Sequence, residues 1–448
     1  MMIAPALAIL LGVGHALVAL LVRHTRLYWF ERWALAFLIG TAAVSGLWLA
    51  CGPFYGRIRP VWLLSVLSVV IMGSVARSHK PRWQRPRVRM ATGDAILSAV
   101  LGAEFVALVL ASLRTPLGWD GLFNFEIKAR LIFESDPSGR FPWAYLSDAS
   151  RIWSHPQYPL MVPFAEFWIY SWLGRVDQAA IKILFPLFYF SLIALVCGSV
   201  RRMATARVSL LTGIAMGLLP PLTLLPGAAS GYADVPLAAA AVGSVCFGLL
   251  ALQTKNDEAW VLAGVLSAIA TWTKVEGVLL AGSVAAAALA ALKSGSAPVR
   301  TMRPLVWIPL AAALPWLVVQ QRYGMPSADL MPVSPAAVLE SVTRLQAVGG
   351  IFARELLRPG QWGVVWPAWC VAIAFVVVLR RPRPSEWFLV GSVALPLVLY
   401  LIVFTWSAWL DPLEHERTAL PRLLVPVAPV ALMFTILTFY DGLSVEPS

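Results

Sequence analysis

Long apolar stretches alternate with short polar segments along the chain. Eleven of these stretches contain 17 to 21 residues, which is about the length that an α-helix needs to cross the hydrocarbon core of a membrane. This pattern predicts an all-α, polytopic membrane protein. The stretches are 3–22, 33–51, 60–77, 94–113, 180–200, 208–224, 233–252, 304–320, 362–379, 386–405 and 421–440.

A further apolar segment, 259–292, requires a different interpretation. Its 34 residues would form a single helix of about 51 Å, whereas the hydrocarbon core is about 30 Å thick. The polar sequence Thr273-Lys-Val-Glu-Gly277 interrupts the segment. We therefore predict two short helices that meet at this break, which brings the total to about 13 transmembrane helices.

Composition agrees with this class of protein. Hydrophobic residues make up 59% of the chain and charged residues only 13%, compared with about 25% charged residues in soluble domains. A net charge of +12 raises the question of nucleic acid, but the basic residues lie in short runs between apolar segments, as is typical of membrane topology. We therefore expect the membrane, and no nucleic acid, as a partner.

The distribution of Lys and Arg predicts the orientation. If the predicted spans alternate, 19 of the 35 Lys and Arg residues fall on one side, nearly all in short loops. The other 16 lie mostly in two long loops, 114–179 and 321–361, and long loops cross largely regardless of charge. The short loops therefore indicate an outside N-terminus, a cytoplasmic tail at 441–448 and location in the inner (plasma) membrane, if the host is bacterial.

The long outer loops carry patterns of their own. Loop 114–179 contains a helical pattern at 122–133 and an aromatic stretch at 158–173. Aromatic residues at this density favour the membrane interface, so we predict two helices lying on the membrane surface. Residues 335–356 predict another helix in the second loop.

Five polar clusters lie beside apolar spans on the predicted outer side. Charged groups near the membrane core are costly and are usually retained for a function. Because these clusters come from separate parts of the chain and share one side, we predict that they form a single site. They are Asp120–Arg130, His155–Pro159, Gly231–Asp234, Lys274–Glu276 and His415–Arg422.

Each cluster also has a purely structural interpretation. Asp120 and Asp234 both precede helical patterns and are therefore candidate N-caps. Glu126 and Arg130 are spaced as an i,i+4 ion pair, and Lys128 and Arg130 would balance Glu126. Lys274 and Glu276 would neutralise each other, His155 would be a structural residue before proline, His415, Glu416 and Arg417 would be solvated, and Arg422 would be a snorkelling anchor at a helix end.

The polar motifs resemble those of the glycosyltransferase-C superfamily, integral membrane enzymes that use polyprenyl-phosphate sugars. Within it, the chain is similar to the bacterial branch that includes aminoarabinose transferases and dolichyl-phosphate-mannose mannosyltransferase-like proteins. One departure is Gln157, where related chains are expected to carry Asp. The motifs are Asp120 in Trp-Asp-Gly, Lys128-Ala-Arg130, His155-Pro-Gln-Tyr-Pro159, Gly231-Tyr-Ala-Asp-Val-Pro236, Thr273-Lys-Val-Glu-Gly277 and Arg422-Leu-Leu.

The resemblance covers about residues 94–440 and implies a membrane catalytic domain there, with 114–179 as a periplasmic loop. Residues 1–93, with three predicted helices and a basic cytoplasmic loop, are additional to the usual plan. The implied reaction moves a sugar, with inversion, from a polyprenyl-phosphate donor to a glycan, lipid or protein acceptor in the envelope. It leaves open whether a divalent metal is needed, and it implies no other cofactor.

The resemblance also implies roles for individual residues. A carboxylate must remove the acceptor's proton, and Asp120 is the first candidate for this base. Asp234 would bind substrate hydroxyls or orient Asp120. The remaining candidates would bind substrate, with Arg422 and Lys274 on the donor phosphate: Lys128, His155, Tyr158, Tyr232, Lys274, Glu276, His415 and Arg422.

Two other classes of function fit parts of the pattern. A transporter or flippase of a lipid-linked saccharide would also use intramembrane charges and broken helices, but only one break is evident and the two halves of the chain show no repeat. A structural membrane subunit would not need polar clusters on one side. We therefore favour a glycosyltransferase whose active site is at the periplasmic face.

Overall fold

The computed structural model describes residues 3–51, 70, 73, 91–135, 143–294, 298–327, 330–409 and 411–444. Within these ranges every element is a helix, and the one β-contact is an isolated bridge between Leu330 and Ser407. The predicted all-α class is therefore confirmed for the described part of the chain. The predicted span at 60–77 lies outside it.

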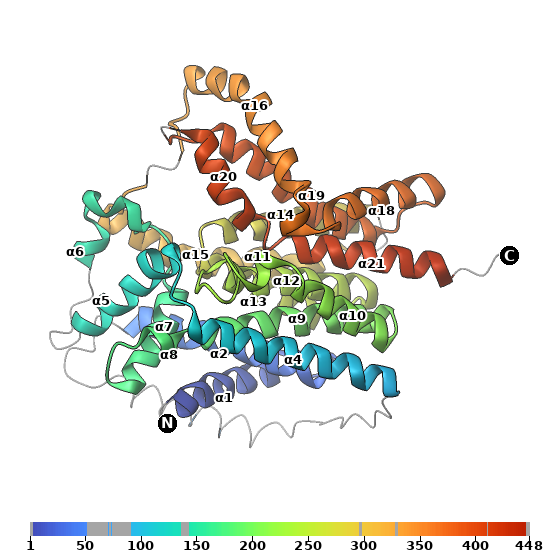
Figure 1. Ribbon diagram of the computed structural model, residues 1–448, viewed down its shortest axis with the longest axis horizontal. Coiled ribbons are helices and arrows are strands. Elements are labelled where there is room, and N and C mark those ends of the chain that lie inside the picture. The colour runs from blue at the N-terminus through green and yellow to red at the C-terminus, as the bar shows by residue number, and fades with distance from the viewer. Residues whose placement is uncertain are drawn as a thin grey trace.

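The long helices form a bundle with one helix at its centre. Figure 1 shows them running side by side along the long axis of the molecule. The central helix, α12 (Asp234–Thr254), packs against α9 (Leu184–Met203), α13 (Asp257–Thr273) and α19 (Pro384–Thr405). It is buried along most of its length, and its run of alanines at 238–241 allows neighbouring helices to approach closely.

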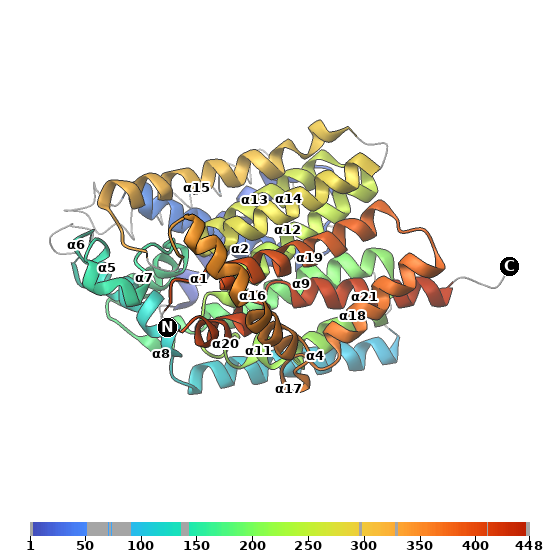
Figure 2. The same cartoon turned by 90° about the horizontal axis from the view of Figure 1, so that it is seen from above.

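Other long helices surround this centre. Figure 2 shows α15 and α4 along opposite sides of the bundle, with the C-terminus at one end. The surrounding helices are α1 (Ile3–Leu21), α2 (Trp29–Cys51), α4 (Thr92–Arg114), α10 (Ala206–Gly217), α14 (Glu276–Ser294), α15 (Arg303–Tyr323), α18 (Val365–Leu379) and α21 (Ala428–Ser444).

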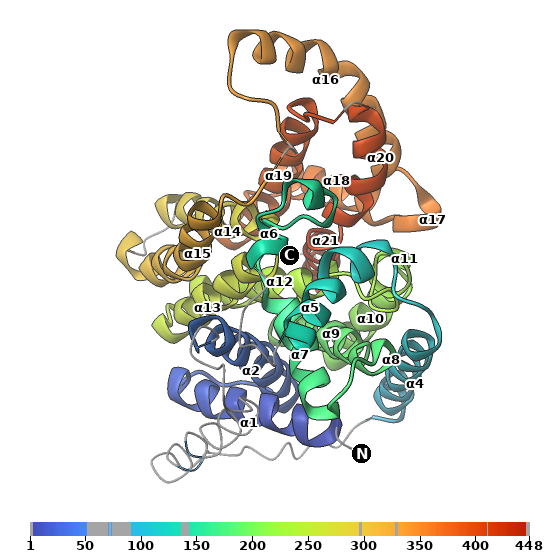
Figure 3. The same ribbon diagram turned by 90° about the vertical axis from the view of Figure 1, so that its left-hand side faces the viewer.

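Helices α5, α6, α7 and α8 gather at the end of the bundle opposite the C-terminus, and α16 and α20 project from its side (Figures 1 and 3). The shorter elements are η2 (Gly121–Glu126), α5 (Ile127–Ser135), α6 (Trp143–Leu146), η4 (Ala149–Ser154), α7 (Met161–Leu173), α8 (Gln178–Ile181), α11 (Pro220–Thr223) and α17 (Pro359–Trp362). The projecting pair is α16 (Pro335–Leu356) and α20 (Pro412–Leu423), and η5 (Val299–Met302) precedes α15.

The described residues contain fewer membrane-length helices than the sequence predicts. Eight helices are long and apolar enough to cross a membrane, or nine if the bent pair Leu413–Leu423 and Ala428–Tyr440 counts as one span. The multi-pass class is thus supported, and the number 13 remains a prediction. The predicted break in 259–292 is present, because α13 ends at Thr273 and α14 begins at Glu276.

Three predicted elements are wrong in detail. The predicted span 208–224 ends as a helix at Gly217, where Pro220 and Pro221 soon follow and interrupt regular helix formation. Arg422 does not begin the last span, because it lies in the final turn of α20, and α21 starts at Ala428 after a bend of 52°. Helix α7 does not lie on a surface, since all ten residues from Met161 to Tyr170 are buried in the protein.

The main chains of helices α1 and α2 approach each other closely at two glycines, Gly14 and Gly40. A Cβ at Gly40 would collide with the main-chain oxygen of Leu10, and a Cβ at Gly14 would collide with that of Ala36. A Cβ at Gly46, which is also in α2, would meet nothing within 4 Å. The two helices therefore depend on glycine at the first two positions and not at the third.

Alanine substitution should separate these positions. We expect Gly40→Ala to lower the thermal unfolding midpoint of the purified protein, because overpacking costs about 1–3 kcal/mol. Gly46→Ala is the matched control and should leave the midpoint unchanged or raise it, since alanine favours helix by about 1 kcal/mol over glycine. Equal midpoints for the two variants would contradict the close packing of α1 on α2.

Candidate active site

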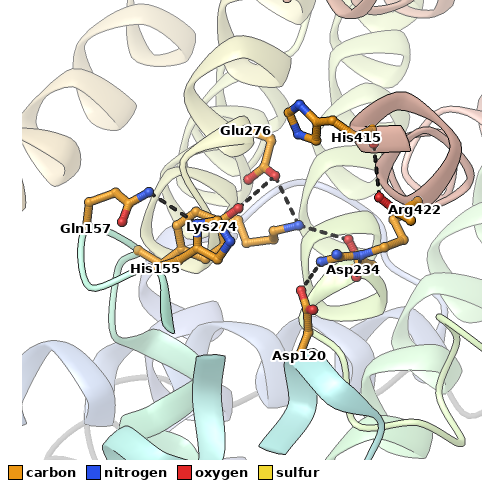
Figure 4. A network of polar contacts seen from close by, with 10 residues as sticks. Asp120, His155, Gln157, Asp234, Lys274, Glu276, His415 and Arg422 are labelled. Carbon is orange, nitrogen blue, oxygen red and sulfur yellow. Dashed lines mark hydrogen bonds and ion pairs between the residues drawn. The ribbon is translucent and has the colours of Figure 1, made fainter. Parts of the chain in front are cut away.

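Five charged side chains form one network at the end of the bundle (Figure 4). The guanidinium of Arg422 contacts the Asp120 carboxylate through Nη2 and lies 3.4 Å from Asp234 Oδ2 through Nε. The Lys274 ammonium lies 3.0 Å from Asp234 Oδ1 and 3.1 Å from Glu276 Oε1. Arg422 and Lys274 thus meet at Asp234, which accepts from both cations.

The network joins parts of the chain that are far apart in sequence. Asp120 immediately precedes η2, Asp234 begins α12, Lys274 and Glu276 flank the break between α13 and α14, and Arg422 lies near the end of α20. The structure therefore brings together members of four of the five polar clusters that the sequence places on one side.

Glycines dock the Asp120 segment against the Asp234 segment. The amide of Gly118 donates to the oxygen of Ser230 at 2.8 Å, and a Cβ at Gly121 would come within 2.9 Å of the Ser230 and Gly231 oxygens. Gly231 itself has φ of +78°, a conformation that favours glycine. The Trp-Asp-Gly and Gly-Tyr-Ala-Asp motifs therefore need their glycines so that the two carboxylates can lie near one cation.

Neither aspartate caps a helix through its side chain. Asp120 occupies the N-cap position of η2 but makes no capping hydrogen bond, and the N-cap of α12 is Ala233 rather than Asp234. Both carboxylates turn to Arg422 instead. The N-cap interpretation is therefore wrong for both residues. Element η2 is a π-helix, a rare element that often occurs at functional sites.

The break at 273–277 places Lys274 and Glu276. Lys274 ends α13 with an extended backbone, and a Cβ at Gly277 would collide with the main-chain oxygen of Ala270. Glycine at 277 thus lets α14 start directly against the end of α13, and this tight reversal turns Lys274 inward toward Asp234.

The network has a buried part and an accessible edge. The side chains of Asp234 and Lys274 are each only 1% exposed, whereas those of Asp120, Glu276 and Arg422 are 11%, 19% and 20% exposed. A substrate would therefore meet Asp120, Glu276 and Arg422 first. The buried Asp234 contacts Arg422, and the buried Lys274 contacts Glu276, so this pair positions two of the accessible side chains.

Aromatic side chains lie over the cations. Arg422 lies over the ring of Tyr232, 5.1 Å from its centre, and Lys274 lies over the ring of Tyr158 at 5.6 Å. The hydroxyl of Tyr158 donates to Glu276 Oε1 at 3.5 Å. Such cation–π contacts stabilise cations within a partly desolvated site, so both tyrosines support the network without charge of their own.

His155 and Lys128 form a second layer behind Tyr158. The His155 ring stacks on Tyr158 at 4.7 Å, and its backbone has φ of +46°. Lys128, which is 1% exposed, donates to the main-chain oxygen of His155 at 2.7 Å. Gln157, in the position where Asp is expected, accepts through its main-chain oxygen from Trp316 Nε1 at 2.9 Å, which ties this loop to α15.

His415 is placed by a different set of contacts. Its Nδ1 lies 2.8 Å from Ser407 Oγ, and its ring stacks on Trp409 at 4.2 Å and meets Phe404 edge-on. Figure 4 includes it in the view of the network. These aromatic contacts give His415 a place in the structure that needs no substrate.

The predicted Glu126–Arg130 pair is not the one that forms. Arg130 pairs with Glu134 at 2.8 Å, and Glu126 accepts from the hydroxyl of Tyr170 at 2.8 Å. Lys128 points to His155 rather than balancing Glu126. Glu126 is buried and turned toward Tyr170, whereas Arg130 is exposed on α5 and pairs with the next acidic residue along that helix.

Two buried ionisable groups were not singled out from the sequence. Lys182, 2% exposed, donates to Thr115 Oγ1 at 3.0 Å and fixes the chain just before Asp120. Glu166 is fully buried, and burial raises its pKa, as it does that of nearby Glu126. Both could have been found from the sequence, because each is a charged residue in an apolar stretch. Glu166 lies within the run 161–173, and Lys182 lies at the start of the span 180–200.

Among the residues that the structure describes, no group of three or more His, Cys, Asp and Glu side chains is arranged to hold a metal ion. In the network itself, the carboxylates of Asp120 and Asp234 are engaged by Arg422 and Lys274.

Lys128 predicts a measurable pH dependence of stability. Burial lowers its pKa from 10.5 to about 7, partly opposed by the charge of Asp120. Between these pH values the unfolded chain holds a proton that folded Lys128 has released, so the free energy of unfolding that is due to Lys128 rises with pH across this window. Relative to Lys128→Met, the wild-type protein should become more stable between pH 7 and pH 9.5.

Thermal unfolding at the two pH values measures this difference. Lys255→Met is the matched control, because Lys255 is exposed and its replacement should leave the difference between the two midpoints unchanged. An identical pH response of wild-type protein and Lys128→Met would mean that Lys128 keeps its ordinary proton affinity in the folded protein.

Comparison with known proteins yields no relative. No protein-family model matches the chain, and no curated protein and no solved structure matches it either. The function must therefore be inferred from the site itself.

Proposed function

We propose that this protein is a membrane glycosyltransferase that uses a polyprenyl-phosphate sugar as donor and works at the periplasmic face of the membrane. The observation that carries the proposal is the network of Asp120, Asp234, Lys274, Glu276 and Arg422 at one end of an apolar bundle. Charges in such a place are costly and are usually kept for a task. The resemblance of the motifs adds the class of reaction.

Asp120 is the proposed general base. A base for this reaction must be a carboxylate that the acceptor can reach, and Asp120 lies at the accessible edge of the network. It would remove the proton from an acceptor hydroxyl or amine as that group attacks the anomeric carbon. The bond from this carbon to the phosphate oxygen breaks, and the polyprenyl phosphate leaves with the bonding electrons.

Arg422 is the proposed ligand of the donor phosphate. Its contacts with Asp120 and Asp234 use one N–H of Nη2 and that of Nε, which leaves the N–H groups of Nη1 for a phosphate. The network contains three carboxylates and two cations, so an incoming phosphodiester adds a further negative charge that competes with Asp120 and Asp234 for Arg422. Donor binding at Arg422 would therefore free Asp120 to act as a base, and the arginine would then meet the charge that develops on the leaving phosphate.

Lys274 is proposed to support the site rather than to bind the phosphate directly. Its ammonium is buried and already lies between Asp234 and Glu276. This differs from the direct phosphate contact that the sequence suggested for it. Glu276, which is more accessible, is the proposed partner for sugar hydroxyls together with Tyr158.

Turnover assays test the base. Purified protein in lipid nanodiscs would be given undecaprenyl-phosphate mannose or undecaprenyl-phosphate aminoarabinose with an envelope extract as acceptor, and release of undecaprenyl phosphate would be measured by mass spectrometry. Asp120→Asn should lower turnover by about 10²–10⁴. Asp148→Asn, which changes an exposed aspartate in the same loop, is the control and should retain activity.

Two results would contradict the proposal. Near-normal turnover of Asp120→Asn would remove Asp120 as the base. Movement of the intact lipid-linked sugar across the bilayer without release of undecaprenyl phosphate would instead indicate a transporter or flippase, a function that the broken helix pair at Lys274 also suits.

The second test concerns the phosphate ligand. Arg422→Lys keeps the charge but loses the planar group that can hold two oxygens at once. We expect kcat/KM to fall at least about tenfold, or about 1.4 kcal/mol of transition-state binding. Arg175→Lys, which changes an exposed arginine away from the network, is the matched control. Wild-type kinetics for Arg422→Lys would exclude Arg422 from the phosphate site.

A further inference from the structure

A polar cavity lies between α16 and α20. It has a volume of about 360 Å³ and is lined by Ile351, Arg354, Glu355, Arg358, Glu416, Arg417, Leu420 and Pro421. Figure 3 shows the two helices side by side where they project from the bundle, and they pack against each other. Arg422 lies six positions after Glu416, which places the two about 120° apart around α20. The cavity is therefore separate from the network of Asp120 and Arg422.

Three arginines with weak partners line this cavity. Arg358 lies 3.4 Å from Glu355, and Arg417 lies 3.6 Å from Glu414. Arg354 makes no hydrogen bond or ion pair with any residue that the structure describes. Glu355 is further engaged by the indole of Trp362 at 3.1 Å. The guanidinium groups thus retain most of their donors for an anion, and arginine is well suited to phosphate oxygens.

Glu416 gives the cavity a second requirement. Its side chain is fully buried, and neither carboxylate oxygen has a hydrogen-bond partner in the described part of the chain. A buried carboxylate without donors is costly. A ligand that completes this cavity must therefore supply hydrogen-bond donors to Glu416 as well as an anion to the arginines.

The neighbouring surface of α16 indicates where such a ligand comes from. Val338, Leu339 and Val342 are exposed on this helix, Leu339 to 68%. An amphipathic helix with exposed aliphatic residues is suited to lie at the boundary between lipid headgroups and acyl chains. On a regular helix the cavity residues Arg354 and Arg358 point to the side of α16 opposite these aliphatic side chains, which is the side that a helix at this boundary turns toward the headgroups and water.

We propose that the cavity between α16 and α20 binds a phospholipid headgroup, with its phosphate on Arg354, Arg358 and Arg417 and its ammonium or hydroxyl group on Glu416. Phosphatidylethanolamine and phosphatidylglycerol satisfy both requirements. Phosphatidylcholine has the phosphate but no hydrogen-bond donor in its head. A bound headgroup would link α16 to α20 and so help to hold the helix that carries Arg422.

Lipid binding to the delipidated, detergent-purified full-length protein tests this proposal. Native mass spectrometry would give the dissociation constants of short-chain phosphatidylethanolamine, phosphatidylglycerol and phosphatidylcholine. We expect the first two to bind at least about tenfold more tightly than the third, because only their headgroups can donate a hydrogen bond to Glu416. Glu416→Gln should abolish this preference, and Arg354→Gln with Arg417→Gln should weaken all three lipids about tenfold.

Control variants keep the result interpretable. Arg130→Gln removes an exposed arginine elsewhere and should leave binding unchanged. If the double arginine variant does not purify as a single species, Arg358→Gln should show the same loss to a smaller extent. Equal wild-type affinity for the three lipids, or unchanged selectivity in Glu416→Gln, would overturn the proposal. Displacement of bound lipid by inorganic phosphate at equal concentration would assign the cavity to free phosphate instead.

Discussion

The carboxylate of Asp234 needs its two cations, and much of the site is arranged around that need. Asp234 is 1% exposed at the start of the central helix, and Lys274 and Arg422 both reach it. Removing one partner of a buried ion pair is costly, about 3–5 kcal/mol, because the remaining charge is left without compensation. This constraint ties the break between α13 and α14, and the end of α20, to α12.

Arg422 connects this buried requirement to the accessible chemistry. Its Nε contacts Asp234, and its Nη2 contacts Asp120. The same guanidinium therefore has a fixed contact below and an exchangeable contact at the edge. A lysine ammonium would meet both carboxylates as a point charge and would lack this directional division. The arrangement explains how one residue can both hold the site together and respond to an anionic substrate.

Much of the fold follows from apolar periodicity, and the parts that do not follow have identifiable causes. Helix α16 was predicted with its observed bounds, and the break near Lys274 follows from the length of 259–292 and its polar interruption. The burial of α7 could not be predicted, because an aromatic stretch suits both an interface and a packed core. Helix α7 also contains one carboxylate, Glu166, and composition alone does not show that this residue is buried.

The side-chain partners at the site were less predictable than its membership. Sequence placed Asp120, Asp234, Lys274 and Arg422 near one end of the bundle, but it offered local partners first, such as helix caps for the aspartates. The actual partners come from distant segments, and main-chain contacts of Gly118 and Gly121 with 230–231 bring them together. In the sequence, such tertiary contacts are visible only as glycines. A glycine alone does not identify the segment that packs against it.

Two faces of helix α20 carry residues of two different sites. One face carries Arg422 to the carboxylates of the bundle, and another carries Glu416 and Arg417 to the cavity beside α16. Because α20 is bent away from α21 by 52°, the final long helix of the bundle does not by itself determine where Arg422 lies. The contacts of α20 with α16 and α19 must supply that position, so an interaction in the α16–α20 cavity is in a place to act on the accessible edge of the site.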